Sequence, residues 1–278
     1  GLGNDNFILG ATFTNRDTVN GGTGTDTITT TSAQSTGYAV VTPVTVSNVE
    51  VLALSNALAA ALTTSNISSA INTLELQAAT AASNTVNTPA GTFTVRNDAN
   101  SGLATNAALT FDAAGTAATD VLNVQNAATA AVNNFAAGAD LIATDYETVN
   151  FSTGTTAVNG AQTIDVVTVT PTAGGTSTLN LTGVNGLTTG IITASVINAS
   201  GLTGAAALTM GAAAAAGLTS ITGSANADTL RGDASSSISG GAGADTITGG
   251  AGNDTLLGGE GNDQITSAAG NDSIDGGA

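Results

Sequence analysis

A nine-residue pattern repeats towards the end of this 278-residue chain, and it constrains the fold more than any other feature. From Gly240 the sequence reads GGAGADTIT, GGAGNDTLL, GGEGNDQIT and SAAGNDSID, in the frame G-G-x-G-x-D-x-U-x, where U is apolar. The aspartates recur nine residues apart, at Asp245, Asp254, Asp263 and Asp272. A short fixed period of this kind predicts stacked units that bury one continuous core.

The pattern has a physical reason, because each unit divides into a turn and a short strand. Glycine takes positive φ without strain, so the backbone can turn and direct carbonyl oxygens inward. The aspartate adds a carboxylate, and the apolar residue of the x-U-x strand points to the interior. Stacked turns would form cages of oxygen atoms. Such cages suit Ca²⁺, which takes about six to eight oxygen ligands, better than Mg²⁺, which demands octahedral geometry.

These repeats resemble the RTX, or hemolysin-type, calcium-binding nonapeptide. The resemblance implies a parallel β-roll in which two nonapeptides make one coil and Ca²⁺ lies between a turn and the turn two repeats later. It implies a first site from Gly241, Gly243 and Asp245 facing Gly258, Glu260 and Asp263. It implies a second site from Gly250, Gly252 and Asp254 facing Ser267, Ala269 and Asp272.

Two further sites are implied where the repeat is imperfect. Residues 223–231 (GSANADTLR) fit the frame, and a shortened repeat follows them, with serine where aspartate is expected. This site would join Ser224, Asn226 and Asp228 to Gly240, Ala242 and Asp245. Near the start, residues 21–29 (GGTGTDTIT) match fully and residues 1–8 lack one glycine. That site would join Gly1, Gly3 and Asp5 to Gly21, Thr23 and Asp26, with Asp17 as a further candidate ligand.

The charge balance excludes several classes of function. The chain has 20 acidic residues against three basic ones (Arg16, Arg96 and Arg231), a net charge of −17, and no lysine, histidine, cysteine or tryptophan. A Ser-His-Asp triad, a thiolate or imidazole zinc site and a lysine Schiff base are therefore impossible. Nucleic-acid binding is not expected without basic side chains. Membrane insertion is not expected either, because no apolar run approaches about 18 residues.

Residues 31–220 alternate short period-two segments with turns rich in Gly, Asn, Thr and Ala, which predicts strands. Six segments share one register, in which a polar residue precedes two alternating apolar residues: 50–54, 72–76, 120–124, 147–151, 165–169 and 177–181. We expect an all-β chain with a β-roll at residues 221–278 and the end of a calcium array at residues 1–30. The middle is expected to be either solenoid-like or a β-sandwich.

The middle also holds scattered carboxylates. Glu50, Glu75, Asp120, Asp145 and Glu147 could supply the pair that glycoside hydrolysis needs. Glu50, Asp120 and Glu147 all fall at the start of an expected strand, so solvated strand ends are the favoured interpretation. Neither H-E-x-x-H, G-x-S-x-G nor a phosphate-binding loop occurs. We therefore expect no enzymatic activity.

The composition as a whole resembles bacterial surface-layer (S-layer) proteins of the RTX, type I-secreted kind. The resemblance is carried by the repeats and by segments such as residues 47–54 (SNVEVLAL), 145–151 (DYETVNF) and 196–203 (VINASGLT). It implies a structural protein that is secreted unfolded, binds several Ca²⁺ ions and assembles with itself into a cell-surface lattice. Such lattices are often anchored to lipopolysaccharide, which here would involve a region outside these residues.

Two alternatives stay open from the sequence. The chain could be a repeat segment of a large RTX adhesin or biofilm-matrix protein, or the calcium-binding tail of a secreted hydrolase. The chain lacks an initial methionine and a Sec signal, and residues 276–278 begin another repeat. We therefore expect a fragment of a longer polypeptide.

Overall fold

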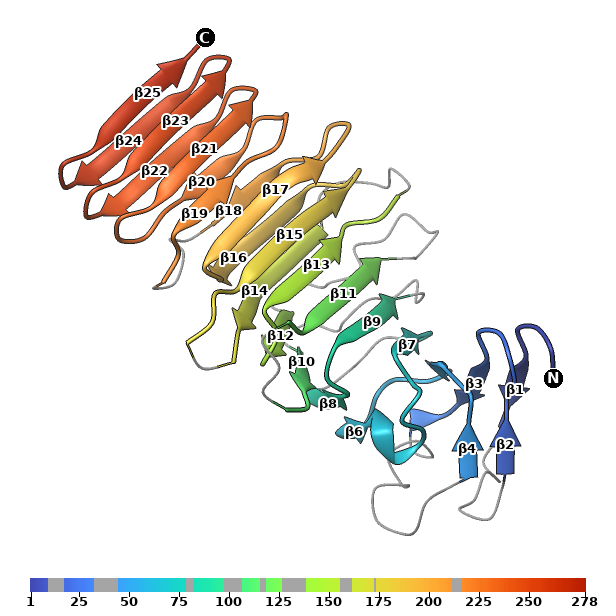
Figure 1. Ribbon diagram of the computed structural model, residues 1–278. Coiled ribbons are helices and arrows are strands. Elements are labelled where there is room, and N and C mark those ends of the chain that lie inside the picture. Colours follow the sequence, from blue (N-terminus) through green and yellow to red (C-terminus); the bar gives the residue numbers. More distant parts are fainter. Residues whose placement is uncertain are drawn as a thin grey trace.

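The computed structural model describes most of the chain, and all structural statements below refer to these parts. They are residues 1–9, 18–32, 45–78, 83–97, 107–115, 119–126, 139–155, 162–172, 174–211 and 217–278. Asp17 lies outside them. Successive strands wind into stacked coils along one long axis, from β1 near the N-terminus to β25 near the C-terminus (Figure 1).

Two long sheets form the coils, and every neighbouring pair of strands within them is parallel. The first sheet has 13 strands in this order: β1 (Asn6–Ile8), β3 (Thr27–Thr30), β5 (Val51–Leu54), β7 (Thr73–Leu76), β9 (Thr92–Asn97), β11 (Val121–Asn126), β13 (Thr148–Ser152), β15 (Thr178–Gly183), β17 (Val196–Leu202), β19 (Ser220–Thr222), β21 (Ser237–Ala242), β23 (Thr255–Glu260) and β25 (Ser273–Gly277).

The second sheet has ten strands: β6 (Leu62–Thr63), β8 (Asn84–Thr88), β10 (Ala108–Ala113), β12 (Asp140–Thr144), β14 (Gln162–Thr170), β16 (Leu187–Thr193), β18 (Leu208–Met210), β20 (Thr229–Arg231), β22 (Thr246–Ala251) and β24 (Gln264–Ala269). A separate pair joins β2 (Thr18–Asn20) to β4 (Thr45–Ser47), and η1 (Thr64–Asn66) is a single 3₁₀ turn. No helix among the described residues has the length and hydropathy of a membrane span.

The core is a set of apolar ladders between the two sheets. Strands such as β9, β11 and β13 alternate buried and partly exposed residues, as expected for strands with one face on the core. The parallel register places buried residues of successive coils directly over one another, and one ladder runs through Phe93, Leu122, Val149, Leu179 and Ile197. Each coil therefore covers the apolar row of its neighbour, which no single coil could do alone.

The middle of the chain is a solenoid, and the sandwich alternative is wrong. The chain passes from one sheet to the other at almost every strand, and each strand pairs with the strand one coil away. Five of the six predicted segments form strands of the first sheet (β5, β7, β11, β13 and β15), while residues 165–169 lie in β14 of the second sheet. The all-β fold and its parallel β-roll are thus as the sequence predicts, and the first sheet runs unbroken past residues 30 and 220.

Candidate metal centre

Aspartates stand immediately before the strands of the C-terminal coils and tie each coil to the next. The backbone N–H of Asp245 donates to Oδ1 of Asp263 at 2.9 Å, and that of Asp228 donates to Oδ1 of Asp245 at 2.8 Å. In the other row, Asp254 N–H donates to Oδ1 of Asp272 at 3.0 Å. One carboxylate oxygen in each pair therefore satisfies a backbone donor of the preceding coil, 17 or 18 residues earlier.

The second oxygen of these carboxylates has no such partner. Oδ2 of Asp245, Asp254 and Asp263 is buried and accepts no hydrogen bond within the described part of the chain. Asp245 and Asp254 are almost fully buried as whole residues. A buried carboxylate oxygen without a donor or a cation is energetically costly, by several kcal/mol when the group is charged. These three atoms therefore indicate a cation-binding position.

Carbonyl oxygens from the next coil share the space beside these free oxygens. A β-carbon at Gly240 would lie less than 3.0 Å from both Asp245 Oδ2 and the Gly258 carbonyl oxygen. Gly249 stands in the same relation to Asp254 Oδ2 and the Ser267 carbonyl oxygen, and Gly258 to Asp263 Oδ2 and the Gly276 carbonyl oxygen. The carboxylate oxygen and the carbonyl oxygen of each pair face one space and repel each other, and a cation between them would remove that repulsion.

Turn glycines allow this close stacking of backbone. Gly259 has φ +112°, and a β-carbon there would come within 3.0 Å of the Gly241 carbonyl oxygen one coil below. Gly243 donates its N–H to the Glu260 carbonyl at 2.8 Å, and Gly252 donates to the Ala269 carbonyl at 2.7 Å. Each of these carbonyls keeps a second lone pair. The residues of the first two predicted sites are therefore brought together by the coil register.

The electrostatics of Asp245 fit the same interpretation. Burial, chiefly, together with the negative charges of Asp228 and Asp263, raises the pKa of Asp245 to about 6, although the hydrogen bond from the Asp228 backbone opposes the shift. Burial also raises the pKa of Asp228. The raised pKa of Asp245 means that the folded coil disfavours its charge in the absence of a counter-ion.

The donor set suits Ca²⁺. Within the described residues, no group of three or more His, Cys, Asp or Glu side chains is placed so that it could hold a metal ion by itself. A bound ion would therefore take most of its ligands from backbone carbonyls and water, with one or two carboxylates. Ca²⁺ accepts such all-oxygen, irregular ligand sets, whereas Mg²⁺ and the transition metals favour stricter geometry or nitrogen and sulfur ligands.

The third predicted site is built differently. The coil register brings its residues together, since Ala242 N–H donates to the Ser224 carbonyl at 3.2 Å. Both carboxylate oxygens of Asp228, however, already accept protein donors: Oδ1 from the Leu208 backbone and Oδ2 from the Ser224 backbone, each at 2.6 Å. The Ser224 hydroxyl and the Asn226 side-chain amide also reach the Ala206 carbonyl, at 3.3 and 2.8 Å. Protein N–H and O–H groups therefore already satisfy oxygen atoms in this turn that a cation would otherwise bind.

The predicted N-terminal site is also assembled. Gly3 N–H donates to the Thr23 carbonyl at 2.9 Å, and Asp5 N–H donates to Oδ1 of Asp26 at 2.8 Å. Asp26 is fully buried, and its Oδ2 has no partner in the described residues. A β-carbon at Gly21 would lie within 3.0 Å of both that oxygen and the Asn48 carbonyl oxygen. Asp26 thus shares the free oxygen and the facing carbonyl of the C-terminal aspartates.

The interpretation of the middle carboxylates as solvated strand ends is wrong for Asp120. This residue is 0% exposed, because the backbone of the coils on either side closes over it. Glu50 and Glu147 are partly buried, and each accepts the backbone N–H of an aspartate one coil earlier: Asp26 at 3.0 Å and Asp120 at 2.8 Å. Glu75 pairs with Arg96 on the neighbouring strand. Sequence reasoning recognised the common register of these residues but not its cross-coil hydrogen bonds.

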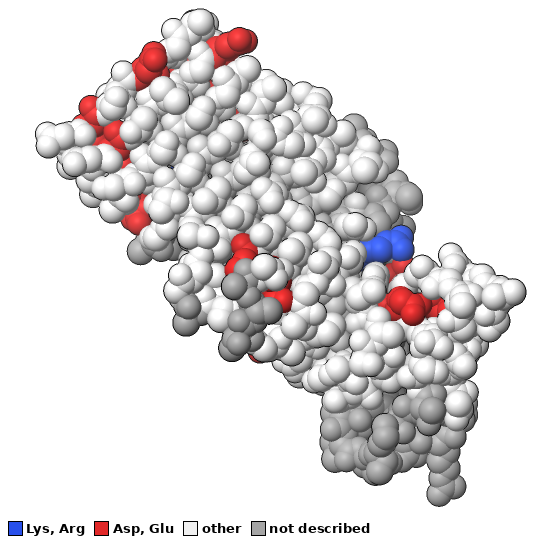
Figure 2. Space-filling view, in the orientation of Figure 1, with Lys and Arg blue, Asp and Glu red and all other residues white. Residues whose placement is uncertain are grey.

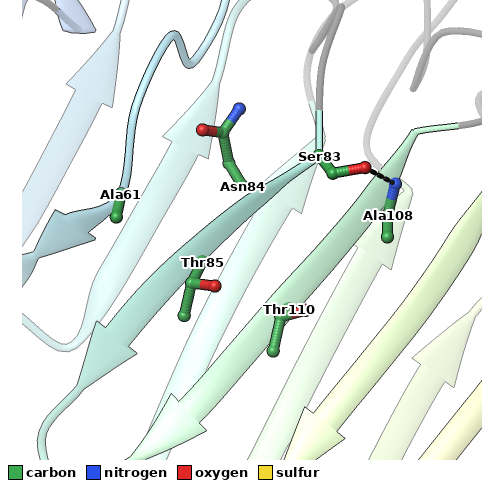
Figure 3. A pocket seen from close by; sticks show the side chains of 6 residues that line it. All are labelled: Ala61, Ser83, Asn84, Thr85, Ala108 and Thr110. Carbon is green, nitrogen blue, oxygen red and sulfur yellow. Dashed lines mark hydrogen bonds between the residues drawn. The ribbon is translucent and has the colours of Figure 1, made fainter.

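One surface pocket of about 250 Å³ lies against the start of the second sheet, between β8 and β10 (Figure 3). It is lined by Ala61, Ser83, Asn84, Thr85, Ala108 and Thr110, and the Ser83 hydroxyl accepts the Ala108 N–H at 3.1 Å. None of these six side chains is ionisable, so the pocket provides no acid, base or charged ligand. The acidic side chains gather instead at the margins of the C-terminal coils and at a few places nearer the middle (Figure 2).

The fold and the turns define a parallel β-roll whose buried aspartates are arranged to hold cations. Comparison with known families agrees with this class: the model of the RTX calcium-binding nonapeptide repeat, in four copies, matches residues 13–32, 235–265 and 258–278. The chain therefore carries RTX nonapeptide repeats, which typically bind Ca²⁺, in both terminal regions. No curated protein and no solved structure matched the chain.

Proposed function

We propose that this protein is a non-enzymatic structural component of a bacterial surface layer, which folds in extracellular Ca²⁺ and assembles with itself on the cell surface. The observation that carries the proposal is the continuous two-sheet solenoid whose turn aspartates keep free, buried oxygens. Repeats of this type are typical of secreted proteins. The S-layer assignment itself is supported by the resemblance in composition and segments noted above.

Calcium would act as the folding switch. Without it, clustered aspartates repel one another and glycine-rich turns carry a large ordering entropy. Extracellular calcium modules bind at about 10⁻⁴–10⁻³ M, far above cytosolic levels, so the chain would stay loose inside the cell and fold outside. A ligand that binds only the folded state contributes about 2.7 kcal/mol per independent site at a hundredfold excess over its Kd.

The test is electron microscopy combined with circular dichroism, with and without Ca²⁺. At pH 7 in millimolar Ca²⁺ we expect a β-sheet spectrum and ordered two-dimensional arrays, and at the same pH in EGTA we expect both to disappear reversibly. A test variant replaces Asp245, Asp254 and Asp263 together by Asn, which keeps the shape of the side chains and removes their charge. This variant should need much more Ca²⁺ to fold than the unchanged chain.

Each alternative role gives a different outcome. Folded but extended, unassembled molecules in Ca²⁺ would overturn the lattice proposal and favour an adhesin or matrix segment. A catalytic domain in the parent chain would favour the tail of a secreted hydrolase. A spectrum unchanged by EGTA would refute calcium-dependent folding itself.

A further inference from the structure

Asp120 is a buried aspartate outside the segments that match the RTX repeat. It directly precedes β11, in the middle of the solenoid, and the matched segments end at residue 32 and resume at residue 235. Its residue exposure is 0%, and its Oδ2 accepts no hydrogen bond in the described part of the chain. This atom has the property that marks the aspartates of the C-terminal repeats.

The backbone around Asp120 copies the backbone around Asp26. Asp120 N–H donates to Glu147 Oε2 at 2.8 Å, and Asp26 N–H donates to Glu50 Oε2 at 3.0 Å. The Asp120 carbonyl accepts from Glu147 and from the next residue, Thr148, at 3.1 and 3.2 Å. The Asp26 carbonyl accepts in the same way from the backbone of residues 50 and 51.

The remaining contacts of the two aspartates also correspond. Asp120 Oδ1 accepts the Gly91 N–H of the preceding coil, as Asp26 Oδ1 accepts the Asp5 N–H. Two residues before each glutamate stands a residue in the left-handed region, Asn48 at φ +51° and Asp145 at φ +58°. The Asn48 carbonyl shares the space beside Asp26 Oδ2, and Asp145 occupies the equivalent position in the second unit.

In the described part of the chain no basic side chain forms an ion pair with Asp120. Within the described residues the one salt bridge joins Arg96 to Glu75, so it does not neutralise Asp120. Tyr146 is buried near Asp120, and its hydroxyl is hydrogen-bonded to Thr88. Burial is the main cause that raises the pKa of this hydroxyl, and the negative charges of Asp120 and Asp112 raise it further. A fully buried carboxylate with negative neighbours and one free oxygen calls for a counter-ion.

We propose that Asp120 is the centre of an additional divalent-cation site, of the Ca²⁺ type, in a part of the solenoid that carries no recognisable repeat. Asp120 Oδ2 is the protein's anionic ligand, and Glu147 fixes the aspartate by accepting its backbone N–H. Backbone carbonyls and water complete the coordination, as an all-oxygen preference allows. The site would hold the middle coils together independently of the terminal repeats and of any lattice.

Tyrosine-sensitised Tb³⁺ luminescence tests this site selectively. Tb³⁺ replaces Ca²⁺ at oxygen sites, and it emits strongly on tyrosine excitation only when the ring lies close by. The chain contains two tyrosines, Tyr38 and Tyr146, and no tryptophan. In the Tyr38→Phe variant Tyr146 is the sole sensitiser, so emission from this variant reports on the surroundings of Tyr146 and not on the C-terminal repeats.

In that background we expect Tb³⁺ emission that excess Ca²⁺ suppresses. Asp120→Asn should abolish most of the emission, while the matched change Asp26→Asn should preserve it, with circular dichroism confirming that both variants fold. Emission retained in a folded Asp120→Asn variant would overturn the site. If Asp120→Asn does not fold, the Tyr38→Phe variant alone tests the site. Absence of sensitised Tb³⁺ emission from that variant also overturns the proposal. Neither readout depends on lattice assembly, so failure of the surface-layer role leaves this test intact.

Discussion

At the scale of single residues, the turn positions of the β-roll are selected by two different constraints. The residue before a strand needs an oxygen for the backbone N–H of the coil below, as Asp263 provides for Asp245. From residue 240 onward the second position of each turn has positive φ, which glycine takes without steric penalty. Ala268 is the exception, because it holds φ +68° at the position that registers with Gly250.

Ala268→Gly should therefore stabilise the C-terminal coils. An L-residue in the left-handed region costs about 1–2 kcal/mol, and the higher chain entropy of glycine returns part of this, so we expect a gain of about 0.5–1 kcal/mol. The opposite change, Gly259→Ala, should cost more than this gain, because its β-carbon would collide with the Gly241 carbonyl. Calcium-saturated thermal unfolding of both variants measures the difference. A change in unfolding temperature of the same sign for both variants would contradict this account of the turn.

These turn residues are also where sequence reasoning was most informative. The nonapeptide frame places Gly and Asp at fixed short separations, so the residues within one turn can be read directly from the sequence. The partners across coils are fixed by the same period where every coil has 18 residues. Asp228 shows the limit, because one of its two backbone donors, Leu208, lies in a neighbouring coil that lacks the repeat.

At the scale of strands, polar ladders on the outer face of the first sheet add to the apolar ladders inside. Asn123, Asn150 and Asn180 stand in register on β11, β13 and β15. The Asn150 amide donates to Asn123 Oδ1 at 2.9 Å, and the Asn180 amide donates to Asn150 Oδ1 at 2.9 Å. A stacked amide row of this kind supports parallel, in-register pairing of identical residues.

Asn150→Ala should break this row at its centre. Two side-chain hydrogen bonds are lost at a partly buried position, and at about 0.5–1.5 kcal/mol each the unfolding free energy should fall by about 1–3 kcal/mol. Ser152→Ala on the same face of β13 is the control, since the Ser152 hydroxyl accepts one long hydrogen bond, from Gly154 at 3.3 Å. Denaturant unfolding compares the two variants. A loss for Asn150→Ala no larger than for the control would show that the amide row is incidental.

At the scale of the whole molecule, the net charge of −17 becomes part of the fold. Ten of the sixteen aspartates lie in the terminal repeat regions, where oxygens of several are buried without a donor. Each bound divalent ion would reduce the negative charge by two, so three ions would bring it to about −11. The charge therefore acts against folding in the absence of cations and favours it in their presence.

The pH dependence of stability should consequently reverse with calcium. In the metal-free protein the folded-state pKa of Asp245, about 6, lies above its ordinary value of 3.8, so the folded state binds the proton more tightly than the unfolded chain does. The free energy of unfolding should then fall as pH rises between those values. With millimolar Ca²⁺, which binds the ionised form, stability should instead rise over the same interval.

Circular dichroism across about pH 4–7 checks both signs: metal-free protein should regain β-sheet signal as pH falls from 7, whereas calcium-loaded protein should lose thermal stability. Asp245→Asn, which cannot titrate, should flatten the metal-free slope relative to the unchanged chain. A metal-free stability that increases with pH through this range would contradict the assignment of Asp245 as a carboxylate held without its counter-ion.

The sequence alone determined the parallel β-roll and its RTX repeats, because these depend on short, fixed spacings along the chain, and the ligands within each turn remain a prediction from it. The tertiary structure decided that the middle is a solenoid, that Asp120 is buried, and that Glu147 lies above it, 27 residues later. The physical reason is that coil length varies outside the repeats. Which residues meet across coils there is set by strand register and backbone hydrogen bonds, and neither appears as a period in the sequence.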